Sequence, residues 1–255
     1  DVFPENRIAQ VMALMLSVMI VVPMVAPIIG SQLTVIYGWQ SIFLFLLCYG
    51  VLVMLAICGF KETLPSKKRH RFTLLHVLCA YWQQLRSLQF VLCAFMSALM
   101  FGILFAFIAS SSFIYQSLYS VVPEHFGFYF ALNAFALLLA TGILTHSGDK
   151  KSPKRFAVGG AVLALVSALI MIGCLWLWPA SIYSFMLPMF FITVGVGFAM
   201  PTSVGMALSH VVDHAGVASA IIGSMQFFVA ALVSASVGFI IHQSALPFAL
   251  LEAGL

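Results

Sequence analysis

Seven long runs of apolar residues limit what this chain can fold into. A helix needs about 20 mostly apolar residues to cross the hydrocarbon core of a bilayer, and each run comes close to that length. The runs are continuous, whereas strands of a membrane barrel alternate polar and apolar residues over short segments. They cover Ile8–Leu33, Ile42–Phe60, Phe90–Phe113, Gly127–Leu144, Phe156–Trp178, Ile182–Leu208 and Val217–Ile241. The sequence therefore predicts an all-α polytopic membrane protein with about seven transmembrane helices.

Composition excludes a soluble fold. Hydrophobic residues make up 63% of the chain and charged residues only 7%, against roughly 25% charged residues in a soluble domain. The five cysteines fall in or beside apolar runs, so we expect buried thiols and neither disulfides nor a metal site. The short apolar stretch Leu246–Leu251 predicts the start of a further helix. The polar leader Asp1–Arg7 lacks an initiating Met, which suggests that the sequence begins inside a longer protein.

The basic residues predict an orientation. All 11 Lys and Arg residues fall at Arg7, between Lys61 and Arg86, and between Lys150 and Arg155. These segments are alternate loops, and the positive-inside rule places such loops in the cytoplasm. We therefore expect a multi-pass protein of the inner (plasma) membrane whose N-terminal end is cytoplasmic. The net charge of +4 follows from this topology and indicates no nucleic-acid partner.

The longest polar stretch, Lys61–Gln89, predicts a boundary between two bundles. Residues 1–60 would supply the last two spans of the first bundle. Residues 61–89 would form a cytoplasmic linker with an amphipathic helix lying near anionic lipid at the inner membrane surface. Residues 90–255 would form the second bundle, with five full spans and the start of another.

The first run contains Pro23 and Pro27, followed by Gly30. Their spacing of four and three residues places all three near one face of a helix. Proline removes a backbone hydrogen bond and kinks a helix, while Ala26 and Gly30 form a small-xxx-small pair that lets another backbone approach. The stretch is therefore either an ordinary kinked transmembrane helix or a packing pivot of a transporter.

Several segments, taken in order, bring a family into view. The first half contains VVPMVAPIIGSQL, GWQSIF and KETLP, and the second half contains FAFIASSSFIY, HFGFYFALNAFALLL and AGVASAIIGSMQFFVAALVSASVG. The set resembles the drug:proton antiporters of the major facilitator superfamily, and among them the Bcr/CflA branch of bacterial multidrug efflux pumps. The resemblance implies twelve spans in two six-helix halves, with this chain matching spans five to eleven and the start of the twelfth. It also implies a monomer in membrane lipid that exports small amphipathic drugs in exchange for protons.

The resemblance assigns two motifs. The proline-glycine antiporter motif maps onto Pro23, Pro27 and Gly30, where it implies helix packing. A degenerate copy of the family's cytoplasmic loop motif maps onto GILTHSGDKKSPKR, in which His146 stands where the motif usually has Asp. The positions that fit this copy are Gly142, Gly148, Lys150 and Lys151. None of the seven runs contains Asp, Glu, Lys or Arg, so we expect the proton-coupling residues in spans that this chain lacks.

Two amides, Asn133 and Gln226, are the best polar candidates inside the predicted spans. Each could tie two helices together by a hydrogen bond, or could line a cavity and bind a drug. Under the second interpretation the aromatic candidates for the substrate site are Phe113, Tyr115 and Phe227.

The residues indicate no catalytic or metal chemistry. His210, Asp213 and His214 echo the H-x-x-E-H zinc motif, but zinc catalysis also needs a third ligand and an open water position. We expect no metal, no cofactor and no enzyme activity. Two alternatives to a transporter stay open: a truncated inactive or regulatory membrane protein, and an intramembrane enzyme, which lacks a convincing catalytic cluster.

Overall fold

The computed structural model describes residues 25–59, 81–147, 153–209, 211, 215–240 and 245–255. The chain divides into a first unit, residues 1–72 and 122–131, and a second unit, residues 73–121 and 132–255. The described residues fold into helices and the turns between them, which confirms the all-α prediction. Among them, six helices are long and apolar enough to cross a membrane. The predicted domain boundaries at residues 60 and 89 stay predictions.

The first unit contains a helix pair joined by a glycine turn. An apolar helix covers Val25–Tyr37, and α2 covers Gln40–Cys58. Gly38 between them has a φ of +82°, which glycine adopts without the steric penalty of a Cβ. The Ser41 hydroxyl donates to the Gly38 carbonyl oxygen at 2.6 Å and fixes the turn. None of the residues of α2 is buried, so its apolar surface is suited to lipid or to other membrane helices.

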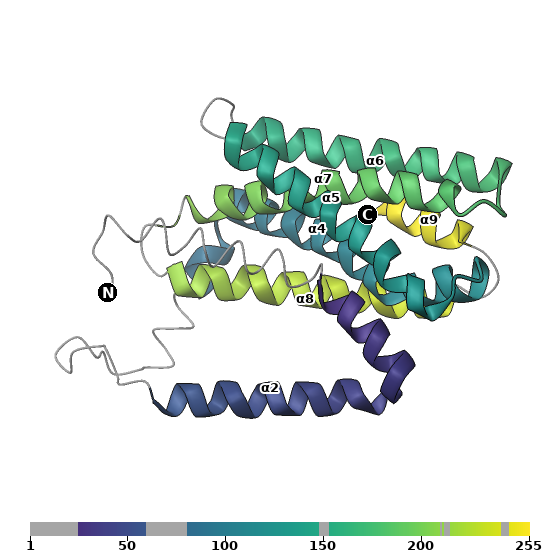
Figure 1. Ribbon diagram of the computed structural model, residues 1–255. Helices are drawn as coiled ribbons and strands as arrows, with labels where there is room; N and C mark the ends of the chain where they lie inside the picture. The colour runs from purple at the N-terminus through teal and green to yellow at the C-terminus, as the bar shows by residue number, and fades with distance from the viewer. Residues whose placement is uncertain (1–24, 60–80, 148–152, 210, 212–214, 241–244) are drawn as a thin grey trace. The chain divides into compact units, whose positions relative to one another are not determined.

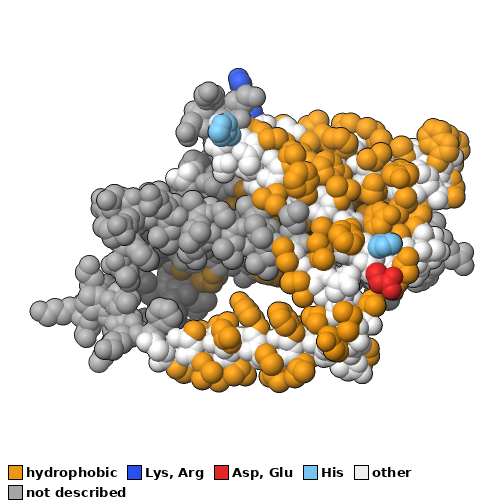
Figure 2. Space-filling model, viewed as in Figure 1, with side chains coloured by type: hydrophobic (Ala, Val, Ile, Leu, Met, Phe, Trp, Pro, Cys, Tyr) orange, Lys and Arg blue, Asp and Glu red, His pale blue; other side chains and the backbone are white. Residues whose placement is uncertain are grey.

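The second unit is a bundle built around two central helices. It contains α4 (Leu88–Ser112), the π-helix η2 (Phe113–Leu118), most of α5 (Pro123–Ser147), α6 (Pro153–Leu177), α7 (Tyr183–Leu208), α8 (Ala215–Ile240) and α9 (Leu246–Gly254). The packing order is α8 on α4, α4 on α7, and α7 on α6, with α9 beside α6 (Figure 1). Apolar side chains cover the visible outer face of this unit, as expected for a surface that contacts lipid (Figure 2).

Two span ends differ from the sequence prediction. The helix expected to end at Phe113 continues through η2 to Leu118, because Ile114 and Tyr115 are fully buried and extend the core. The next helix begins at Pro123 instead of Gly127. Proline is favoured at the first helical position, where its missing N–H costs no hydrogen bond. The predicted loop of residues 114–126 is therefore reduced to a short turn.

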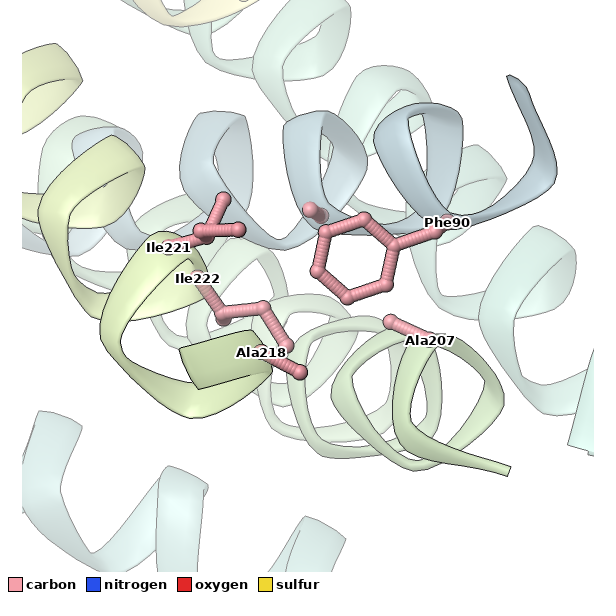
Figure 3. Close-up of a cluster of buried hydrophobic side chains, with 6 residues drawn as sticks. Phe90, Ala207, Ala218, Ile221 and Ile222 are labelled. Atoms are coloured by element: carbon pink, nitrogen blue, oxygen red, sulfur yellow. The ribbon is translucent and has the colours of Figure 1, made fainter. Parts of the chain in front are cut away.

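A cluster of buried side chains packs between α4, α7 and α8 at one end of the bundle (Figure 3). Phe90 of α4 lies against Ala207 of α7 and against the α8 residues Ala218, Ile221 and Ile222. The same end of α4 is capped by Ser87, whose Oγ accepts a hydrogen bond from the Phe90 N–H at 3.4 Å. The start of α4 is thus fixed by both packing and capping.

Glycines set the closest helix contacts of the second unit. A Cβ on Gly160 of α6 would lie 2.5 Å from the Gly195 carbonyl oxygen of α7, and a Cβ on Gly195 would lie 2.5 Å from the Gly160 carbonyl oxygen. On the other side of α7, a Cβ on Gly197 would lie 2.6 Å from the Ala140 Cβ of α5. Gly195 and Gly197 therefore serve as packing positions within a continuous helix.

Candidate functional site

Asn133 lies inside the bundle, between α5 and α7. Its exposed fraction is 2%, and that of Thr193 on α7 is 1%. The Thr193 hydroxyl lies 3.3 Å from Asn133 Oδ1 and 3.0 Å from the Met189 carbonyl oxygen, so one proton serves two acceptors. This geometry fits the first interpretation of Asn133, a hydrogen bond that ties two helices together.

Gln226 lies between α8 and α4 in a more open setting. It is half-buried, and its Nε2 lies 3.5 Å from Ser97 Oγ, which is a long hydrogen bond. The Ser97 hydroxyl donates to the Ala94 carbonyl oxygen at 2.7 Å. The amide of Gln226 is therefore only weakly held by the protein.

Phe227, which follows Gln226 in the chain, contacts two aromatic side chains of α4. The Phe227 side chain is 62% exposed, and its ring meets Phe101 and Phe105 of α4 edge-on, with centroids 5.3 and 6.0 Å apart. We call Ser97, Phe101, Phe105, Gln226 and Phe227 the amide-aromatic patch. It offers an exposed apolar ring beside one amide donor and acceptor.

The other two aromatic candidates lie elsewhere. Tyr115 is fully buried and meets Phe107 and Phe185 edge-on, with centroids 6.5 and 5.6 Å apart. Phe113 is 38% exposed at the start of η2, and π-helical turns occur often at functional sites. The structure thus brings Gln226 and Phe227 into one patch, while it places Asn133 and Tyr115 in packed interfaces.

Only part of the proline-glycine motif, Pro27 and Gly30, lies within the described residues. Pro23 lies outside the described residues, and a Cβ on Gly30 would meet nothing within 4 Å. Gly30 lines an apolar groove of about 440 Å³ between its own helix and α2. On another side of that helix the backbones come close, because a Cβ on Gly127 would lie 2.9 Å from the Ile28 Cα and from Ser31 Oγ. The packing role assigned to the motif stays a prediction.

The loop motif and several other predicted features fall largely outside the described residues. Gly142 is exposed near the end of α5, with nothing within 4 Å of a Cβ built on it. Nearby, a cavity of about 360 Å³ is lined by residues of α5, α6 and α7, together with Ser209 just after α7. These residues are Leu144, Pro153, Phe156, Thr202, Gly205, Met206 and Ser209. The predicted features that lie outside the described residues are Gly148, Lys150, Lys151, His210, Asp213, His214 and residues 61–80 of the linker.

Glu252 is a residue that the sequence analysis overlooked. The apolar stretch predicted to end at Leu251 continues as α9 to Gly254. The Glu252 side chain is 3% exposed, and neither carboxyl oxygen has a hydrogen-bond partner within the described chain. The sequence feature that could have pointed to Glu252 is a single acidic residue in an otherwise apolar helix.

Comparison with known proteins identifies the family. The profile of the Major Facilitator Superfamily matches residues 1–234. The "Uncharacterized MFS-type transporter YdgK" of Bacillus subtilis is 27% identical over 244 residues, which cover 93% of this chain and 60% of that protein. The "Bicyclomycin resistance protein homolog" of Haemophilus influenzae is 27% identical over 266 residues, which cover 97% of this chain and 62% of that protein.

A third relative matches a shorter part of the chain. The "Multidrug resistance protein MdtL" of Salmonella heidelberg is 31% identical over 72 residues, which cover 28% of this chain and 18% of that protein. The chain spans about 60% of the length of the two longer relatives. The family match and the membrane-spanning helices indicate a multi-pass membrane protein. The chain belongs to the Major Facilitator Superfamily.

Proposed function

We propose that the protein containing this chain is a multidrug efflux transporter of the Bcr/CflA type, which exports small amphipathic drugs in exchange for protons. The amide-aromatic patch carries this proposal. Ligand sites of this kind are mostly apolar, with a few polar groups that set the orientation of the ligand. The printed names of two relatives, a bicyclomycin resistance protein homolog and a multidrug resistance protein, support the substrate class.

The chemistry of the patch suits substrates of varied structure. Phe227 exposes its ring to an incoming apolar group, and aromatic pairs tolerate several stacking geometries. Gln226 can donate or accept, and its 3.5 Å contact with Ser97 Oγ is weak enough to exchange for a ligand. No charge in the patch restricts the substrate to one sign. The patch therefore favours neutral or singly charged amphipathic molecules.

The remaining parts of the proposal follow from the sequence pattern. The protein works as a monomer in the inner membrane, surrounded by lipid and with its basic loops in the cytoplasm. Its partners are the drug and the proton, and nucleic acid is not among them. The proline-glycine motif of the first predicted span acts in this proposal as a packing element of the transporter.

Substitution of the two amides separates ligand binding from helix packing. We expect Gln226→Ala to change drug selectivity, with resistance raised for some compounds and lowered for others. Asn133→Ala is the matched comparison, because its amide hydrogen bond with Thr193 lies in the packed interior. Loss of such a bond in a membrane protein costs about 0.6 to 2 kcal/mol, so we expect resistance to fall in parallel for all drugs.

The measurement is a panel of drug susceptibilities in cells that express the complete reading frame. Each value is normalised to the amount of transporter in the membrane. A uniform loss of resistance with Gln226→Ala, like that expected for Asn133→Ala, would remove Gln226 from the substrate site.

A further inference from the structure

Glu252 is a buried acidic side chain of the second unit that the amide-aromatic patch does not use. Its exposed fraction is 3%. Neither Oε1 nor Oε2 accepts a hydrogen bond from any described residue. Buried polar groups in proteins are nearly always hydrogen-bonded, so an unpartnered buried carboxyl calls for a physical explanation.

The position of Glu252 on its helix rules out a surface role. The buried residues at this end of the chain are Ala245, Phe248, Ala249 and Glu252, a spacing that marks the core-facing side of a helix. Phe248, one turn before Glu252, packs on Phe185 of α7 with ring centroids 5.6 Å apart. Glu252 therefore occupies a core position next to an aromatic contact.

Among the described residues, few titratable side chains lie on the helices that pack against α9. Of the described helices, α6 and α8 make the main contacts with α9, and the described part of α8 carries no titratable side chain. On α6 the titratable side chains are Lys154, Arg155 and Cys174. Figure 1 shows α9 beside the C-terminal half of α6, whereas Lys154 and Arg155 lie in the first turn of that helix. On α7, which reaches α9 through an aromatic contact, Tyr183 is exposed.

The electrostatics of this setting favour a neutral carboxyl. An isolated carboxylate in an apolar interior loses its hydration and gains no counter-charge in return, which is far more costly than burying the protonated acid. Ionisable side chains within membrane bundles commonly mark pathways for ions or protons. The protonated acid can also become ionised as soon as water or a cation reaches it.

We propose that Glu252 is a proton-binding site in the interior of the second unit. When the helices around α9 move apart and water enters, the O–H bond of the carboxyl breaks. The proton passes to water, and its electron pair stays on the carboxylate. When the helices close again, the carboxylate recovers a proton. This inference adds a proton-binding residue to the proposed drug:proton exchange. Only the use of this residue in transport rests on the proposed function.

Infrared spectroscopy of the purified protein tests the site without any transport measurement. We expect the difference spectrum between the parent and Glu252→Gln at neutral pH to show the C=O stretching band of a protonated carboxylic acid. The band should shift in D₂O, because an exchanging site replaces O–H by O–D, and carboxylate bands should replace it at alkaline pH. Glu124→Gln is the control, because it removes an exposed carboxyl group in the first turn of α5.

Two results would overturn the proposal. One is an ionised Glu252 at neutral pH, shown by carboxylate bands in place of the C=O band of the acid. The other is a protonated acid whose band does not shift in D₂O, which would show an inert buried group. If Glu252→Gln fails to fold, Glu252→Asp provides the comparison. It retains a carboxylic acid and should shift the frequency of the same C=O stretching band. A protein that shows the exchanging band but carries no drug would leave the proton site standing and reject the proposed function.

Discussion

Gly160→Leu is expected to prevent stable folding of the second unit, whereas Gly159→Leu should leave it intact. The two glycines are neighbours on α6 but face different surroundings. A Cβ on Gly160 would lie 2.5 Å from the Gly195 carbonyl oxygen and 2.7 Å from the Ala199 backbone nitrogen, both on α7. Because these are backbone atoms of a packed helix, a rotamer change cannot relieve the clash. Overpacking typically costs about 1 to 3 kcal/mol and occasionally more, and the contact with rigid backbone atoms places Gly160→Leu at the upper end.

The neighbouring substitution is a stringent control for this effect. A Cβ on Gly159 would meet nothing within 4 Å, and replacing a glycine in a helix interior by leucine gains up to about 1 kcal/mol of helix propensity. The measurement is thermal unfolding of each purified variant in detergent, followed by tryptophan fluorescence. Equal midpoints for the two variants would show that α6 and α7 do not cross at Gly160.

Phe90→Ala is expected to cause the second largest loss of stability, about 3 to 5 kcal/mol. The Phe90 side chain is 1% exposed and fills the contact among α4, α7 and α8 that Figure 3 shows. Removal of the ring leaves a cavity among Ala207, Ile221 and Ile222, and helices packed on three sides can collapse only partly into it. The unfolding midpoint in detergent should fall accordingly.

Phe95→Ala on the same helix provides the comparison for Phe90. Its ring is 46% exposed, so its loss leaves no enclosed cavity and should change the unfolding free energy by about 0.5 kcal/mol or less. If Phe95→Ala destabilises as much as Phe90→Ala, then the core lies on a different face of α4.

The sequence predicts the helices well because long apolar runs admit few alternatives. The boundaries are harder, as the region between Phe113 and Pro123 illustrates. Ile114 and Tyr115 are buried and extend the helix, but periodicity cannot detect this in a chain that is apolar on nearly every side. The same lack of contrast hides which of Gly159 and Gly160 faces α7, since a lipid-facing and a protein-facing residue can be equally apolar.

The candidate site could be predicted only in part. Asn133 and Gln226 are recognisable because an amide in a membrane span needs a partner. Their partners, Thr193 and Ser97, lie 60 and 129 residues away in sequence, and tertiary packing alone selects them. Glu252 was overlooked because the apolar stretch before it is too short to predict a span.

The most direct test of the proposed exchange is drug-dependent proton movement in everted membrane vesicles. The vesicles contain the product of the complete reading frame and are acidified inside by respiration, and a pH-sensitive dye reports the interior. We predict that a lipophilic drug added outside releases protons from these vesicles, and that vesicles lacking the protein, or treated with a protonophore, show no such release. No drug-dependent proton release across a varied drug panel, with the protein present at normal abundance, would contradict the proposal that this protein exchanges drugs for protons.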